Sequence, residues 1–205
     1  SRGIQSVATV TLRVGTQNPI VGLDLSVTDL SGAPIDQITV GSQFQLRGYV
    51  QDLRSAGSSL GVFAAYEDIL YSSTLVSVVD SSTNDPNLGF QVQFGSNYQR
   101  VREGDIRTTG LINELGAVST GDIPLGTGRE LLFTVTMTAN ATGTASFVAD
   151  PADIKPLHDT LTYNPVEALD VKFYRPLAAA VVRGITTLRT LSTLTTMDSS
   201  PQSTH

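Results

Sequence analysis

The sequence predicts an all-β protein, a flattened jelly-roll sandwich of about nine to ten antiparallel strands. Short segments in which polar and apolar residues alternate recur along the chain, and they are rich in Val, Thr, Leu, Phe and Tyr. Gly, Asn, Asp, Ser or Pro separates most of these segments, as expected for turns. With 40% hydrophobic and 16% charged residues in 205 positions, the chain can bury the core of one large domain.

The individual strands follow from this alternation. Val7–Val14 reads VATVTLRV, Leu23–Thr28 reads LDLSVT and Phe44–Val50 reads FQLRGYV. Further strands are predicted at Gly61–Ser72, Leu75–Val79, Phe90–Phe94, Leu131–Thr138, Thr144–Val148, Leu169–Phe173 and Leu177–Val182. Only Gly110–Gly116 and parts of Asp153–Leu161 are expected to form helical turns.

The chain divides into three predicted parts. Residues 1–20 form an N-terminal strand or extension, residues 21–183 the sandwich, and residues 184–205 a tail rich in Thr and Ser. From Ile185 to Met197, apolar residues occupy every third position, a period that matches neither a strand nor a good α-helix. The composition of the tail is typical of a flexible linker. Two alternatives are that the tail pairs with a sheet edge of a neighbouring copy and builds a filament, or that it folds back on its own sandwich. The candidate assembly residues are Ile185, Leu188, Leu191 and Leu194.

Composition and charge exclude several classes of function. The net charge of −6 argues against binding to a phosphate backbone, so no nucleic-acid partner is expected. No run of about 18 apolar residues predicts a membrane span. Without Cys, the chain offers no disulfide framework and no thiolate site. The low charged fraction and the many Ser, Thr, Asn and Gln residues are typical of an extracellular protein, and we expect a secreted or cell-surface protein.

No catalytic constellation stands out, and the sequence predicts no enzyme. Gly57–Gly61 reads GSSLG and matches the nucleophile pattern G-x-S-x-G, but a strand follows Ser59 where that motif requires a helix. Adjacent residues of a strand point to opposite faces, so Glu67 and Asp68 cannot form a glycosidase pair. We expect His158 to form a hydrogen bond with the neighbouring Asp159.

One acidic stretch is a candidate for calcium binding. Three acids lie in the Pro-interrupted segment DPADIKPLHD and could supply carboxylate oxygens to Ca²⁺, namely Asp150, Asp153 and Asp159. Their spacing does not match an EF-hand loop, and Asp also commonly caps turns. These acids are therefore either calcium ligands or caps of turns, and no other cofactor is predicted.

Several segments together resemble one family. These are VGSQFQLRGYVQDLR (Val40–Arg54), GVFAAYEDILYSSTLVSVV (Gly61–Val79), GLINELGA (Gly110–Ala117), LGTGRELLFTVTMTANATGTASFVADPAD (Leu125–Asp153) and PLHDTLTY (Pro156–Tyr163). They resemble cohesin-like modules, in particular those in secreted and cell-surface proteins of planctomycete-type bacteria. The resemblance runs from about Leu23 to Val182 and implies a flattened jelly roll without catalytic activity.

The resemblance also implies a binding face. Cellulosomal cohesins hold a dockerin on one exposed sheet face, and Gly61–Ser72 would lie on that face. Ile69 and Tyr71 would then point inward. The candidate partner-binding residues point outward and are Ala64, Tyr66, Asp68 and Leu70. The expected partner is a dockerin-like module or further copies of the chain.

Two further expectations concern Glu67 and glycans. Glu67 shares the inward phase of Gly61–Ser72, so it should be partly buried with an Arg or a backbone donor within hydrogen-bond reach. The alternative function is a carbohydrate-binding module. Such modules usually present aromatic platforms, and this chain has no Trp and only 6 Tyr.

Overall fold

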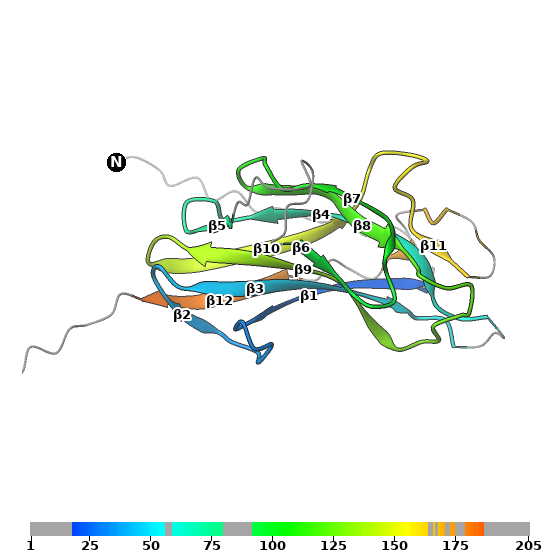
Figure 1. The fold of residues 1–205 in the computed structure, drawn as a ribbon, viewed down its shortest axis with the longest axis horizontal. Helices are drawn as coiled ribbons and strands as arrows, with labels where there is room; N and C mark the ends of the chain where they lie inside the picture. Colours follow the sequence, from blue (N-terminus) through cyan, green and yellow to red (C-terminus); the bar gives the residue numbers. More distant parts are fainter. Residues whose placement is uncertain are drawn as a thin grey trace, which may run out of the picture.

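Two β-sheets pack face to face and enclose the hydrophobic core in the computed structural model (Figure 1). The structure describes residues 18–55, 59–79, 92–163, 166, 168–170, 173–174 and 179–186. Its strands are β1 (Val21–Thr28), β2 (Gln37–Thr39), β3 (Gln43–Asp52), β4 (Val62–Tyr71), β5 (Val76–Val78), β6 (Val92–Phe94), β7 (Arg100–Asp105), β8 (Leu111–Val118), β9 (Arg129–Ala139), β10 (Gly143–Pro151), β11 (Leu161–Thr162) and β12 (Ala179–Thr186). The predicted all-β sandwich is confirmed.

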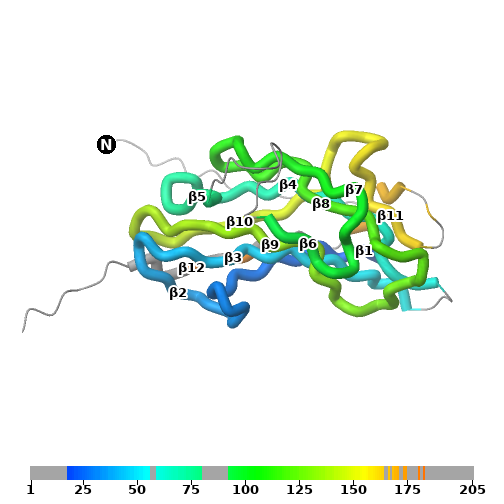
Figure 2. Tube along the Cα trace, viewed as in Figure 1, coloured from blue at the N-terminus to red at the C-terminus, as the bar shows by residue number. Residues whose placement is uncertain are grey.

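The two sheets differ in size and order. The first sheet has five strands in the order β1-β3-β9-β5, with β6 also paired to β9. Seven strands form the second sheet in the order β2-β12-β10-β4-β8-β7, with β11 also paired to β4. All of these pairings are antiparallel except that of β12 with β2. Strand β4 lies between β10 and β8 in the interior of the second sheet (Figure 2).

The core follows from the alternation along the strands. On β3, Phe44, Leu46 and Val50 are buried, whereas Gln45, Arg47 and Tyr49 on the opposite face are partly exposed. Phe44 meets Phe147 of β10 edge to face at 6.1 Å between ring centroids, and this contact joins the two sheets. Burial of each such ring stabilises the fold by about 2 kcal/mol.

The segment Gly110–Gly116 is a strand, and the prediction of a helical turn there is wrong. Two steps on β4, from Glu67 to Ile69, are matched by three steps on β8, from Leu115 to Ile112. This β-bulge puts one extra residue between the inward-facing Ile112 and Leu115, and the resulting spacing of three imitates a helix. Pairing with both β4 and β7 decides the structure.

The predicted strand Leu169–Phe173 is also wrong at its described residues. The Leu169 N–H donates to the Thr160 carbonyl, and the Phe173 N–H donates to the Asp170 carbonyl three residues earlier, which closes a turn. Ala168 and Tyr174 form single bridges to Leu161 and Val21, and these bridges do not extend into a strand ladder among the described residues.

The described residues form no helix that is long and apolar enough to cross a membrane.

The ends of the chain bear on the predicted division into parts. β12 runs to Thr186, and its last residues lie parallel to β2, where Ile185 pairs with Ile38. Ile185 also faces Gly143 of β10, so its backbone belongs to the sandwich of its own chain. The predicted strand Val7–Val14 and the assembly candidates Leu188, Leu191 and Leu194 lie outside the described residues. The three-part division and tail-mediated assembly stay predictions.

Candidate functional site

The outer face of the second sheet is covered at one end and open at the other. After β10, residues 152–160 leave the sheet, and the chain returns to β4 as β11. We call residues 152–160 the cap. They arch out on the side of β7 and β8 (Figure 1). The two ends of this face offer different chemistry.

Beneath the cap lie two of the predicted partner-binding residues. Ala64 and Tyr66 do point away from the main core, as predicted, but each is only 1% exposed. They form a second apolar cluster with Ala152 of the cap, to which Phe63, Val118 and Leu161 add partly buried side chains. The expectation that Ala64 and Tyr66 are exposed is therefore wrong, because the connection between β10 and β11 packs on them.

Tyr66 is held on three sides. Its ring stacks on His158 of the cap, with 4.7 Å between centroids and 24° between planes. Its hydroxyl donates to the Val101 carbonyl at 2.8 Å. On β8 the ring crosses Gly116, where a Cβ atom would lie 2.6 Å from Tyr66 Cδ1 and 2.0 Å from the Ala65 carbonyl oxygen. Burial, with a smaller effect of Glu103, raises the pKa of the Tyr66 hydroxyl to about 12.

Glu114 fixes the cap to the sheet. It is the bulge residue of β8, has a φ of 55° and is 2% exposed. Its Oε1 accepts the N–H of Asp153 at 2.9 Å and that of Ile154 at 3.0 Å, and its Oε2 lies 2.5 Å from His158 Nδ1. Burial acts to raise the pKa of Glu114, but these bonds outweigh it, and the pKa is lowered.

The sequence analysis did not identify Glu114, and it paired His158, the partner of Glu114, with Asp159. His158 bonds to Glu114, and Asp159 instead forms an ion pair with Lys155 at 2.5 Å. The interpretation of a His158–Asp159 pair is therefore wrong. One signal was available: the spacing of three between Ile112 and Leu115 marks the bulge at which Glu114 changes its direction.

An apolar row crosses the open end of the face. Leu70 of β4 is 60% exposed and lies opposite Val148 of β10 on one side and Leu111 of β8 on the other. Cross-strand partners point to the same face, so these three side chains form one contiguous surface. The sequence predicted Leu70 but not its two neighbours. We call Leu70, Val148 and Leu111 the apolar row.

An acidic group lies next to the apolar row, on the side of the cap. Asp68 faces Asp150 across the strand pair, and its Oδ1 accepts the Glu114 N–H at 2.6 Å. Carboxylate oxygens of Asp68, Glu114 and Asp153 all lie within 4.8 Å of one another. Burial raises the pKa of Asp68, and so do the nearby charges of Glu114, Asp153 and Asp150, against the effect of the Glu114 N–H.

The calcium candidates are only partly brought together. Asp150 and Asp153 lie near Asp68, whereas Asp159 is 7% exposed and is paired with Lys155. Glu114 already accepts bonds from the cap with both of its oxygens. Calcium binding at Asp150, Asp153 and Asp159 stays a prediction.

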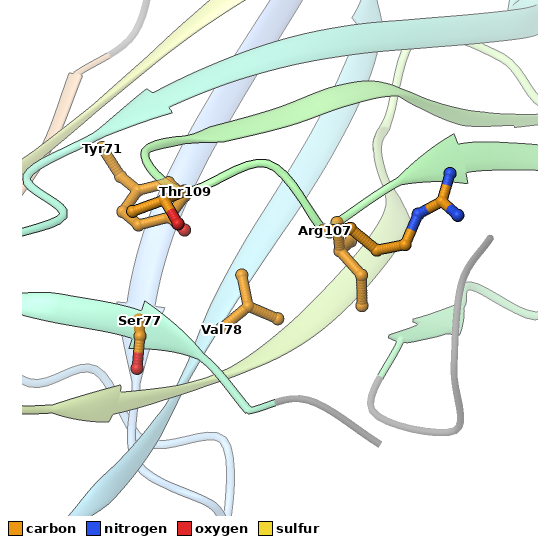
Figure 3. Close-up of a pocket in the computed structure, with 6 residues that line it drawn as sticks. Tyr71, Ser77, Val78, Arg107 and Thr109 are labelled. Carbon is orange, nitrogen blue, oxygen red and sulfur yellow. The ribbon is translucent and has the colours of Figure 1, made fainter. Parts of the chain in front are cut away.

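A cavity of about 180 Å³ lies elsewhere, where β4 and β5 approach the turn before β8 (Figure 3). It is lined by Tyr71, Ser77, Val78, Ile106, Arg107 and Thr109. The guanidinium of Arg107 extends away from the other labelled side chains and pairs with Asp105 at 2.7 Å. The lining residues carry three hydroxyls but include no Asp, Glu, His or Lys. They therefore offer no nucleophile with a neighbouring base.

Glu67 lies on the inner side of β4, as its phase predicted. It is 0% exposed, and neither of its carboxylate oxygens has a hydrogen-bond partner among the described residues. The expectation of an Arg or backbone donor is therefore wrong for the described residues. Ala65 and Ile69 share the inner face of β4 with Glu67, and Leu115 lies opposite it on β8, and none of these side chains can donate a hydrogen bond. Burial, with a contribution from Asp24, raises the pKa of Glu67 well above its usual value.

Comparison with solved structures shows the fold. The seventh ScaB type I cohesin of Pseudobacteroides cellulosolvens matches 83% of this chain and 95% of its own length with a TM-score of 0.53 and 9% identity. A cohesin module from a family 33 glycoside hydrolase of Clostridium perfringens matches 83% of this chain and 100% of its own length (TM-score 0.48, 14% identity).

A third solved structure includes a partner. The sixth cohesin of scaffoldin B from Acetivibrio cellulolyticus, in complex with a Cel5 dockerin, matches 78% of this chain and 97% of its own length (TM-score 0.42, 15% identity). No protein-family model and no curated protein matches the sequence. The chain has a cohesin-like fold.

Proposed function

We propose that this chain is a non-catalytic protein-binding module of a secreted or cell-surface protein, and that it holds its partner on the open end of the second sheet's outer face. The apolar row carries this proposal. Leu70 at 60% exposure is flanked by Leu111 and Val148 on the adjacent strands, so an apolar surface crosses three neighbouring strands. Exposed apolar surface with a polar rim is typical of a protein interface.

The partner that we propose is a dockerin-type module. The Acetivibrio cellulolyticus cohesin forms its complex with a dockerin, and a common fold supports a partner of the same class without fixing its identity. Of the predicted partner-binding residues, Leu70 and Asp68 belong to the proposed surface. Ala64 and Tyr66 support it from beneath the cap. Self-assembly into a filament and glycan binding remain predictions to which the described contacts add no support.

A display library of dockerin modules tests the proposal. The library is selected against the full chain, and the recovered modules are then measured against Leu70→Asp. Leu30→Asp is the matched control, because Leu30 is 56% exposed in the turn after β1 and lies outside the second sheet. A charge in the centre of an interface removes apolar contact and is left desolvated, so the loss of affinity should reach about a hundredfold.

The outcomes separate clearly. Modules that bind the wild-type chain and Leu30→Asp equally, but not Leu70→Asp, support the proposal. Two results would overturn it: a selection that recovers no module, or recovered modules that bind Leu70→Asp as well as the wild-type chain. Thermal unfolding of both variants confirms that each remains folded.

A further inference from the structure

The acidic residues beside the apolar row lack a cationic partner within the part of the chain that the structure describes. Among the described residues, no Lys or Arg forms an ion pair with Asp68, Asp150 or Asp153. The two basic groups of the cap are already engaged, since His158 contacts Glu114 and Lys155 contacts Asp159. Negative charge is therefore concentrated at this point of the surface.

The structure holds this negative charge in a fixed position. Asp68 cannot turn away freely, because its Oδ1 accepts the Glu114 N–H at 2.6 Å. Asp153 follows the first residue of the cap, and its own N–H is held by Glu114 at 2.9 Å. Asp150 is fixed by the pairing of β10 with β4. Fixed charges lose little conformational entropy when a ligand of opposite charge binds.

The position of these acids relative to the apolar row limits the kind of ligand. Along β4, Asp68 and Leu70 point to the same face two residues apart, and the same is true of Asp150 and Val148 along β10. A partner that covers the apolar row therefore places its flanking residues over the acids. A partner with neutral or acidic residues there would leave like charges or unpaired carboxylates in the interface.

We propose that the segment of the partner that contacts this face combines an apolar ridge with a Lys or Arg that enters between Asp68, Asp150 and Asp153. This inference rests on the proposed function and names the chemistry of its partner. A long basic side chain fits, because its aliphatic stem can lie against Leu70 while its charged end reaches the carboxylates. The charge contributes to specificity and to the rate of association.

A matched pair of peptides tests the inference without any natural partner. Both are amphipathic helices with the same row of Leu residues, and they differ only in Lys or Glu at the flanking positions. We expect the full chain to bind the Lys peptide at least about tenfold more tightly at low salt, and this preference to weaken at about 0.5 M salt. Binding is measured by fluorescence anisotropy.

Two double variants locate the preference on the surface. Asp68→Asn with Asp150→Asn should abolish the preference for the Lys peptide. Asp36→Asn with Asp122→Asn removes the same number of carboxylates from exposed positions outside the proposed surface and should preserve the preference. Equal binding of the two peptides to the wild-type chain, or a preference that both double variants share, would overturn the inference.

Calcium is the rival occupant, and calorimetry with CaCl₂ decides between the two. Heat from a saturable calcium site that disappears in Asp68→Asn with Asp150→Asn, together with loss of the Lys preference in calcium, would assign the acids to the metal and overturn the inference. The proposed function fails independently, if dockerin modules ignore Leu70→Asp. Modules that require Leu70 but tolerate Asp68→Asn with Asp150→Asn would retain the function and reject the basic contact.

Discussion

Two glutamates of the second sheet are buried to the same degree, but their surroundings are opposite. Glu67 on β4 is 0% exposed and faces the main core, where neither oxygen has a described partner. Glu114 on β8 is 2% exposed and faces the cap, where both oxygens accept hydrogen bonds. The comparison teaches that burial alone does not decide whether a carboxylate stabilises the fold, since the partners decide it.

Glu67 is not the only buried polar group near this part of the core that has no described hydrogen-bond partner. The hydroxyls of Thr160 and Tyr174 are also buried without a hydrogen bond of good geometry. Burial raises the pKa of Tyr174 to about 12, Thr160 opposes this effect, and the charges of Asp159 and Glu67 add to it. This end of the core is therefore polar but poorly paired, whereas the contact of Glu114 with the cap is fully paired.

The largest effect is expected from Glu114→Ala. Removing the carboxylate leaves two partly buried backbone N–H groups and His158 without their acceptor, so the free energy of unfolding should fall by about 3 kcal/mol. Urea unfolding at pH 7 measures it. Glu103→Ala on β7 is the control, because its carboxylate accepts no hydrogen bond from a described residue, and it should change stability by less than about 0.5 kcal/mol. Equal losses in both variants would contradict the role of Glu114.

The same contrast shows why part of the site could not be predicted from sequence. The inward phase of Ile69 and Glu67 follows from alternation within one strand and was predicted, although Glu67 was expected to be only partly buried and is 0% exposed. The cap has no such periodicity, and its packing on Tyr66 depends on where the chain returns to β4. Glu114 was missed because the bulge breaks the local alternation, and the spacing of three between Ile112 and Leu115 that marks the bulge was interpreted as a helical turn.

The apolar row illustrates the same limit at longer range. Leu111, Leu70 and Val148 lie far apart in the sequence and become neighbours only through the register of three strands. Register is fixed by the whole buried face of a sheet, and a single sequence does not reveal it. The fold class could therefore be predicted from local patterns, whereas the binding surface required the pairing of the strands.

The pH dependence of stability should distinguish the two glutamates next. Because the folded pKa of Glu67 lies above its unfolded value, the folded state binds this proton more tightly. The destabilisation that comes from ionising Glu67 is absent below the unfolded pKa of about 4.3. It grows by about 1.4 kcal/mol per pH unit as pH rises toward the folded pKa. Glu67→Gln cannot ionise, so its unfolding free energy should rise relative to the wild type through this window. Urea unfolding from pH 4 to 8 measures the difference, and parallel curves would rule out a buried ionisable Glu67.

Glu114 should show the opposite sign. Its folded pKa is lowered, so its stabilisation is present above the unfolded pKa and is lost as pH falls through the folded pKa. Glu114→Gln should therefore be less stable than the wild type near neutral pH, and the difference should shrink in acid. The same urea series measures both variants. A difference that grows in acid would reverse the assignment.

A smaller effect is expected when each glutamate is replaced by Leu at pH 7. Glu67→Leu replaces a buried polar group that has no described hydrogen-bond partner with an apolar side chain, and should be neutral or stabilising by up to about 1 kcal/mol. Glu114→Leu at the cap should be destabilising. Melting temperatures of the two variants measure the contrast, and a clear loss in Glu67→Leu would show that its carboxyl has partners in solution.

The smallest effect should come from the cap side of the Glu114 contact, at His158. In His158→Phe the aromatic stack on Tyr66 is preserved, but the contact with Glu114 Oε2 is lost. Glu114 still accepts hydrogen bonds from the N–H groups of Asp153 and Ile154, so the free energy of unfolding should fall by only about 1 kcal/mol relative to the wild type. His158→Ala removes the stack as well and should lose about 1 kcal/mol more. Urea unfolding of both variants separates the two contributions: if Phe and Ala are equally destabilising, the stack on Tyr66 contributes nothing, and the polar contact alone holds His158 against the sheet.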